Sequence, residues 1–152
     1  MTACVCGMDG HVEELVLSCT IPLSPRSKQR PRFANGRVHT SRATVQWERD
    51  CRVYLRSVWT APPLDGLVRV DIVAVFKRPR RLEAKRHPDG RIPKPSTPDW
   101  DNVAKIVGDS GNKIIWSDDG CIWDGRCRKY YAARNEQPGV ELRVWRTTNA
   151  EA

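Results

Sequence analysis

The sequence predicts a small single domain of the α/β (α+β) class, with a mixed β-sheet and about two main helices. Three observations lead to this prediction. The chain has 152 residues, of which 39% are hydrophobic and 29% are charged, so it can bury one modest core and is not disordered. Runs rich in Val, Ile and Leu stand at 13–21 and 67–76. An apolar stripe at helical spacing lies between these two runs.

The first half of the chain is expected to form two strands around one helix. Residues 13–21 have strand character, and a proline follows at once. A helix is expected from about residue 41 to residue 59, because Thr40 or Ser41 can cap it and a Pro-Pro pair stops it. Residues 67–76, LVRVDIVAVF, predict a strand that is buried largely on both faces.

The second half is expected to contain a long loop, a short helix and two strands. Residues 77–98 hold five prolines and no periodic pattern, which predicts a long flexible loop. A short helix is expected at 101–109, and strands are expected at 121–131 and 140–146.

The expected domain spans residues 13–147, with residues 1–12 as a loose leader and 148–152 as a tail. The N-terminus lacks the basic start and apolar stretch of a secretory signal. No apolar run approaches eighteen residues. A cytoplasmic location is therefore expected.

Six cysteines occur in the chain, and without a signal peptide they are expected to be reduced thiols. Cys4 and Cys6 with His11 are similar to half of a zinc site. No second cysteine pair completes that site, and zinc takes four ligands. A zinc module that acts in protein contacts is kept as an alternative reading.

The charge of the chain points to a polyanionic partner. The net charge is +8 and the sequence pI is about 9.5, and nucleic acid is the commonest partner of such a protein. The cations cluster in segments 26–37 and 77–94, which are expected to contact backbone phosphates. Phe33 is a candidate stacking ring. The candidate DNA-contacting residues in these segments are Lys28, Arg30, Arg32, Arg37, Lys77, Arg78, Arg80, Arg81, Lys85 and Arg86.

A group of carboxylates stands in the middle of this basic chain. Asp99 and Asp101 flank Trp100, so in an extended segment both face one spot. Asp118 and Asp119 occupy a polar turn. If the turn lies beside the helix start, three or four carboxylates converge, and their repulsion demands a cation such as Mg²⁺ or Mn²⁺. A metal there activates water and stabilises charge on a phosphodiester. The spacing alone fits turn-capping aspartates equally well.

Lys105 lies one helical turn after Asp101, where it can contact the scissile phosphate or the leaving oxygen. The alternative is an ordinary ion pair along the helix, worth about 0.2–0.5 kcal/mol. Asp109, another turn on, can hold Lys105 in place.

The whole string resembles the RusA family of Holliday-junction resolvases. The match to the family pattern runs without a gap from Pro98 to Ile122 and contains PDWDN-x2-K, Asp109 and W-x-DD. Lys129 comes shortly after it. The segment 28–32, KQRPR, is similar to the basic K-x-R-P-R segment of the family. The likeness covers about residues 15–146.

The resemblance implies a RusA-like fold and metal-dependent cleavage of four-way DNA junctions. It assigns metal binding and catalysis to Asp99, Asp101 and Asp119, a catalytic role to Lys105 and an accessory role to Asp118. It also implies Mg²⁺, a homodimer that makes symmetric paired nicks, and frequent occurrence in phages or prophages. Lys129, which matches the family lysine, joins the DNA-contacting set.

The sequence departs from the family pattern at three positions. Gly111 replaces a usual apolar residue, Lys113 stands where glycine is common, and Cys121 replaces a usual glutamine. These changes concern the connecting loop and leave the expected ligands in place. A non-catalytic junction-binding protein of the same fold remains the main alternative.

Overall fold

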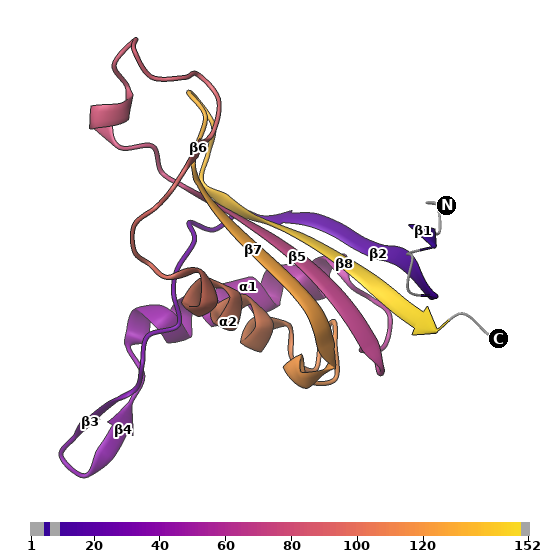
Figure 1. Ribbon diagram of the computed structural model, residues 1–152. Coiled ribbons are helices and arrows are strands. Elements are labelled where there is room, and N and C mark those ends of the chain that lie inside the picture. Colours follow the sequence, from indigo (N-terminus) through magenta and orange to yellow (C-terminus); the bar gives the residue numbers. More distant parts are fainter. Residues whose placement is uncertain (1–4, 7–9, 150–152) are drawn as a thin grey trace.

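A computed structural model of the chain describes residues 5–6 and 10–149. The described residues form one mixed sheet with two long helices on one of its faces (Figure 1), so the predicted α+β class is confirmed. One pair of neighbouring strands in this sheet is parallel, and the other pairs are antiparallel. In spatial order the strands are β1 (Val5–Cys6), β2 (His11–Ile21), β8 (Gly139–Asn149), β5 (Leu67–Phe76), β7 (Ile122–Tyr131) and β6 (Ile92–Pro93).

The strand β5 lies in the middle of the sheet, and the helices cover only one of its faces. Val70 lies opposite Gly125 of β7 and Val144 of β8. Alternate residues, such as Val70 and Ile72, are buried toward the helices, whereas Arg69 and Asp71 between them are only partly buried. The expected bounds of this strand are confirmed. The expected burial on both faces holds only at its end, where Val75 is buried, because both helices pack on the other face.

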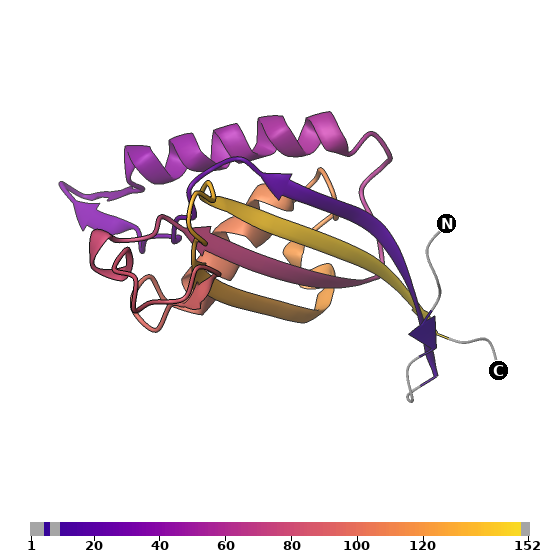
Figure 2. The same ribbon diagram turned by 90° about the horizontal axis from the view of Figure 1, so that it is seen from above.

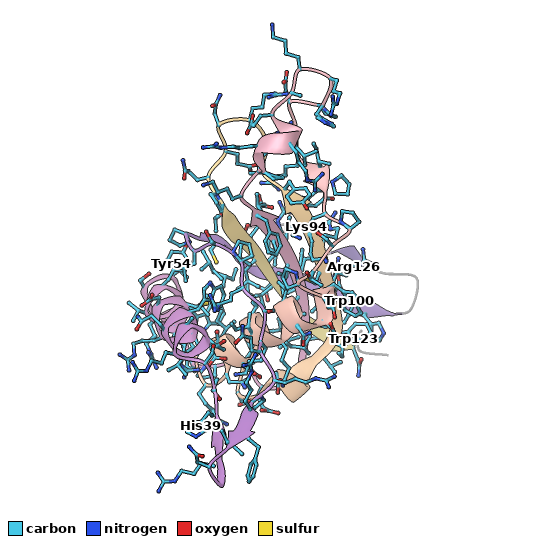
Figure 3. The ribbon with its side chains drawn as sticks, turned by 90° about the vertical axis from the view of Figure 1, so that its left-hand side faces the viewer. His39, Tyr54, Lys94, Trp100, Trp123 and Arg126 are labelled. Carbon is cyan, nitrogen blue, oxygen red and sulfur yellow. The ribbon has the colours of Figure 1, made fainter. Side chains whose placement is uncertain are left out.

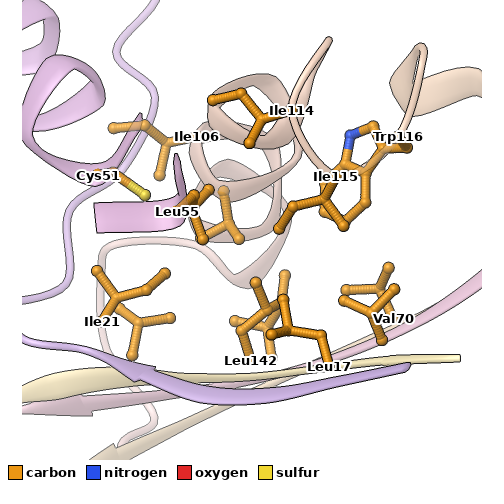
Figure 4. Packing of buried hydrophobic residues seen from close by; sticks show 14 of the residues in the cluster. Leu17, Ile21, Cys51, Leu55, Val70, Ile106, Ile114, Ile115, Trp116 and Leu142 are labelled. Atoms are coloured by element: carbon orange, nitrogen blue, oxygen red, sulfur yellow. The ribbon is translucent and has the colours of Figure 1, made fainter. Parts of the chain in front are cut away.

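The core lies between that face and the helices, as Figure 4 shows. The helix α1 (Arg42–Val58) begins at Ser41, whose side chain accepts a hydrogen bond from the Thr44 amide at 3.2 Å, so the predicted cap is confirmed. Cys51 and Leu55 point from α1 into the core and are fully buried. Burial raises the pKa of the Cys51 thiol to about 12.

The helix α2 (Trp100–Gly111) packs beside α1 and ends against Trp116. Trp116 is fully buried, and its Nε1 donates to the Gly108 carbonyl oxygen at 3.0 Å. A Cβ added at Gly111 would lie 2.3 Å from the Trp116 ring, which explains the missing apolar side chain at this position. Lys113 has φ of 64°, a conformation that glycine adopts more easily.

The segment 77–98 has secondary structure and internal hydrogen bonds, so the prediction of a flexible loop is wrong. It contains the short helix η1 (Arg80–Leu82) and the strand β6. The Arg78 side chain is buried and donates hydrogen bonds to the carbonyl oxygens of Leu82, Pro88, Gly90 and Ala132. Because these bonds join the start of the segment to its middle and to the residue that follows β7, they restrain its shape.

A second small sheet projects from the other basic segment. It is the hairpin of β3 (Arg32–Ala34) and β4 (Arg37–His39). Asn35 and Gly36 have φ of 51° and 73°, the conformation of a two-residue hairpin turn, so the predicted turn is confirmed. Figures 1 and 2 show the hairpin extending beyond the main sheet, away from the chain termini.

The ends of the sheet differ from the expected domain limits. Val5 and Cys6 pair with Glu13 and Val12 inside the expected loose leader. At the other end, β8 continues to Asn149 instead of ending near residue 146. Cys4 of the hypothetical zinc half-site lies outside the described residues. In the described part of the chain, no helix is both long enough and apolar enough to cross a membrane.

Candidate active site

The start of α2 carries the first predicted carboxylate pair. Asp99 occupies the N-cap position, yet within the described residues its side chain makes no capping hydrogen bond. Asp101 lies in the first turn, and its Oδ1 accepts a hydrogen bond from the Asn102 amide at 2.9 Å. Both residues are exposed. The two carboxylates therefore stand at the positive end of the helix dipole, which favours negative charge.

The backbone that leads into Asp99 is held by lysine side chains. The Lys129 Nζ of β7 donates to the carbonyl oxygens of Ser96 and Pro98, both at 2.7 Å. The Lys94 Nζ donates to the Ser96 hydroxyl at 2.7 Å. Lys129 was predicted to contact DNA, but its ammonium group lies against the protein backbone and positions the segment before Asp99.

Lys105 connects α2 to the second predicted carboxylate pair. Its Nζ lies 3.2 Å from Asp109 Oδ1 and 3.5 Å from Asp119 Oδ2. The hydrogen bond to Asp109 is the main reason why the pKa of Lys105 is raised above its ordinary value. Lys105 is therefore cationic at neutral pH, and its side chain remains 56% exposed. The predicted contact between Lys105 and Asp109 is confirmed.

Lys28 lies on the other side of Asp109. Its Nζ pairs with Glu48 of α1 and lies 3.3 Å from Asp109 Oδ2, while its backbone amide donates to the Asn102 carbonyl oxygen at 2.9 Å. Partial burial lowers the pKa of Lys28, but the bonds to Glu48 and Asp109 outweigh it and the pKa is raised. Although it was predicted to contact DNA, Lys28 ties the basic segment to both helices.

Asp118 and Asp119 stand where the chain enters β7. Asp118 caps the short helix η2 (Asp119–Cys121), and its Oδ2 accepts a hydrogen bond from the Gly120 amide at 3.1 Å. The Asp119 Cβ would lie 3.8 Å from a Cβ built at Gly108. Asp119 therefore lies against the middle of α2, whereas Asp99 and Asp101 stand at its N-terminal end.

The expected meeting of three or four carboxylates is not preformed. Across residues 5–6 and 10–149, no group of three or more His, Cys, Asp or Glu side chains is arranged so that it could hold a metal ion. The counter-charge beside Asp119 is the Lys105 ammonium group instead. This arrangement keeps the like charges apart, as their mutual repulsion requires.

Sequence reasoning missed an apolar pocket beside the aspartates. Its volume is about 100 Å³, and Trp100, Ala104 and Gly108 of α2 face Gly125 and Cys127 of β7 across it. Trp100 is 60% exposed. The spacing of four residues from Trp100 to Gly108 was a usable signal. A helix that begins at Asp101, as the sequence predicted, leaves Trp100 out of this spacing.

Exposed cations of the hairpin and of the segment around η1 lie at the end of the molecule where α2 begins. Figure 3 looks onto this end, with Lys94 above, His39 of the hairpin below and Trp100 between them. Arg81 is partly engaged, since its guanidinium lies 5.7 Å from the centre of the Tyr131 ring. The predicted DNA-contacting residues that are exposed are Arg30, Arg32, Arg37, Lys77, Arg80, Arg81, Lys85 and Arg86.

This fold and site define a class of protein, a small α+β domain with exposed carboxylates at the start of one helix and basic segments on either side of it. Residues 22–145 match the family model described as Endodeoxyribonuclease RusA. The chain therefore belongs to the RusA family of Holliday-junction resolvases, and the predicted family and activity are confirmed. A search among curated proteins finds no match.

Proposed function

We propose that the chain is a Mg²⁺-dependent, structure-selective endonuclease in which Asp99, Asp101 and Asp119 bind the metal, with Mn²⁺ as a possible substitute. The observation that supports this proposal is that Asp99 and Asp101 are exposed hard oxygen donors at the start of α2, while Asp119 lies farther along the same helix beside Lys105. Asp99 and Asp101 are exposed, and Asp99 makes no capping bond among the described residues. Asp118 is the accessory ligand of this proposal.

The chain's own groups have separate tasks in this reaction. A metal held by Asp99, Asp101 and Asp119 would supply an activated water and would neutralise charge on the phosphate. Lys105, which Asp109 holds at 3.2 Å, stabilises the charge that develops on the phosphate or the leaving oxygen. Lys129 fixes the backbone before Asp99. We expect a 5′-phosphate and a 3′-hydroxyl at each nick.

A homodimer is part of this proposal. A four-way junction yields two linear duplexes only when two strands are nicked symmetrically. A twofold dimer offers two equivalent sites to two equivalent strands. The exposed cations at one end of each copy favour recognition of the branched shape through its phosphates over recognition of base sequence.

The proposal is tested with a synthetic four-way junction and a matched linear duplex, each with and without Mg²⁺. We expect metal-dependent, paired nicking of the junction alone. Asp101→Asn should abolish cutting while junction binding survives, and Asp65→Asn, at an exposed position before β5, should cut normally. Normal cutting by Asp101→Asn would exclude Asp101 from the mechanism, and equal cutting of linear duplex would exclude structural selectivity.

Metal binding needs a readout that does not depend on activity. Electron paramagnetic resonance of Mn²⁺ titrated into the wild-type protein in complex with an uncleavable junction should report bound metal. The same titration of Asp101→Asn and Asp119→Asn should show a loss of at least tenfold in affinity. Undiminished Mn²⁺ binding by both variants would contradict the proposed ligand set. Junction binding with neither cutting nor metal uptake by the wild type would favour the non-catalytic alternative.

A further inference from the structure

The β3–β4 hairpin has one apolar face and one cationic face. Phe33 lies directly opposite Val38, while Arg32 lies opposite His39 and Ala34 opposite Arg37. Residues that face each other across a hairpin point to the same side, and successive pairs alternate. Phe33 and Val38 therefore share one face, and Arg32, Arg37 and His39 share the other.

The apolar face is uncovered in the single chain. Phe33 is 77% exposed and Val38 is 67% exposed. In the described part of the chain, β3 and β4 pair only with each other. A two-stranded hairpin without a packing partner is marginally stable in water, and burying a side chain such as Phe contributes about 1.5–3 kcal/mol. Exposure of these two side chains to water therefore does not stabilise the free protein, whereas their burial against a partner would stabilise a complex.

The opposite face identifies the chemistry of the partner. A polar hollow of about 260 Å³ lies at the base of the hairpin on its cationic side, close to the N-terminus of α1 at Ser41. Cationic side chains and a helix N-terminus both favour an anion such as a phosphate group. The residues that line the hollow are Gln29, Arg30, Arg32, His39, Thr40 and Ser41.

A partner that offers phosphates to one face and flat apolar surfaces to the other is DNA with unstacked bases. The bases of an intact duplex are stacked, so their faces are closed to a side chain. Apolar side chains of other proteins insert between the base steps of a duplex at a cost of a few kcal/mol for unstacking. At a branch point the stacking is already interrupted, so that cost is reduced. Stacking of one base on an aromatic ring contributes about 1–3 kcal/mol.

We propose that this hairpin is a branch-point probe. Its cationic face holds a backbone phosphate, and Phe33, supported by Val38, inserts against a base that is opened at the crossover. This inference rests on the proposed junction-cleaving function. It adds a physical source of structural selectivity, since the insertion is favourable only where stacking is already broken.

The test uses four-way junctions that carry 2-aminopurine at the bases next to the crossover, in Ca²⁺ so that binding is separated from cutting. The fluorescence of this base rises when it is unstacked. We expect wild-type protein to raise the signal severalfold, Phe33→Ala to lose most of the rise, and Phe33→Trp to retain it. Val53→Ala, at a valine of α1 that is 62% exposed, is the matched control and should behave as wild type.

A full fluorescence rise with Phe33→Ala would overturn the insertion. Sedimentation of the DNA-free protein tests the rival explanation, in which the apolar face of the hairpin covers a second copy of the chain. Dissociation of a dimer by Phe33→Ala, together with a full fluorescence rise by the same variant, would favour that explanation and overturn the insertion. Mg²⁺-dependent cutting by the wild type is measured separately. Normal cutting without any fluorescence rise would reject the probe and leave the proposed function standing.

Discussion

Gly111 is the position in α2 where a single added methyl group meets the core. A Cβ there would lie 2.3 Å from the Trp116 ring, and the indole is fixed because its Nε1 donates to the Gly108 carbonyl oxygen. We expect Gly111→Ala to lower the free energy of unfolding by about 1–3 kcal/mol, the usual cost of overpacking a core. Urea unfolding measures this change.

The matched control for that substitution is Gly90→Ala. No described atom lies within 4 Å of a Cβ built at Gly90, so the same chemical change should shift stability by less than about 1 kcal/mol. Equal unfolding midpoints for the two variants would contradict the packing argument. At this scale the sequence was informative in part, since it marked Gly111 as unusual, but only the fold reveals that Trp116 fills the space.

One buried side chain, that of Arg78, makes many of the hydrogen bonds that hold the segment between β5 and α2. Arg78 Nη2 donates to the carbonyl oxygens of Leu82 and Pro88 at 2.7 and 2.6 Å, and Nη1 donates to Gly90 at 3.2 Å. A buried polar group that loses its partner costs about 1–3 kcal/mol. Arg78→Ala should therefore open the segment locally, which trypsin would detect as faster cleavage after Arg80, Lys85 or Arg86.

Lys77→Ala is the comparison variant, because its side chain is exposed beside the same strand end. It removes one charge and one trypsin site without touching the buried carbonyl groups. Cleavage of Arg78→Ala at the rate of Lys77→Ala would show that the segment is held by other contacts. The distinction also separates a positioning role of Arg78 from the phosphate contact that the sequence suggested.

Elements with a clear local pattern were predictable, and the use of individual cations was not. The bounds of β5 and the cap of α1 at Ser41 follow from residue type and spacing within one segment. The inward roles of Arg78 and Lys129 depend on carbonyl groups that are distant in sequence, such as Ala132 and Ser96. A basic composition predicts an anionic partner, but it does not say which side chains remain available to it.

The same limit applies to the candidate site. The pattern from Pro98 to Ile122 indicated the aspartates, and the structure places Asp99 and Asp101 at one helix start. The sequence pattern could not indicate that Asp119 would lie beside Lys105 and not beside the other carboxylates. That outcome depends on the balance of charge in the folded chain without a cation.

On the scale of the whole molecule, the hairpin and the segment around η1 project from the same end, and α2 begins between them (Figure 1). Their exposed cations can therefore follow DNA arms on both sides of the candidate site. Each phosphate neutralised by a cation releases counterions, so log K against log salt has a slope of about −0.9 per contact. The slope for junction binding thus counts the cations that reach the DNA.

We expect the double substitution Lys85→Ala with Arg86→Ala to make this slope shallower by up to about 1.8 if each cation contacts one phosphate. Arg49→Ala with Arg56→Ala removes the same charge from exposed positions on α1 and should leave the slope unchanged, because these two side chains lie outside the two segments, 26–37 and 77–94, that are expected to contact phosphates. Fluorescence anisotropy of a labelled junction at several salt concentrations measures both slopes. Equal changes in the two pairs would mean that net charge, and not the placement of cations at one end, governs binding. A change confined to the Lys85 and Arg86 pair would locate a DNA arm on the segment that Arg78 holds in shape. The internal hydrogen bonds of Arg78 would then be needed for junction binding, because they position these two cations.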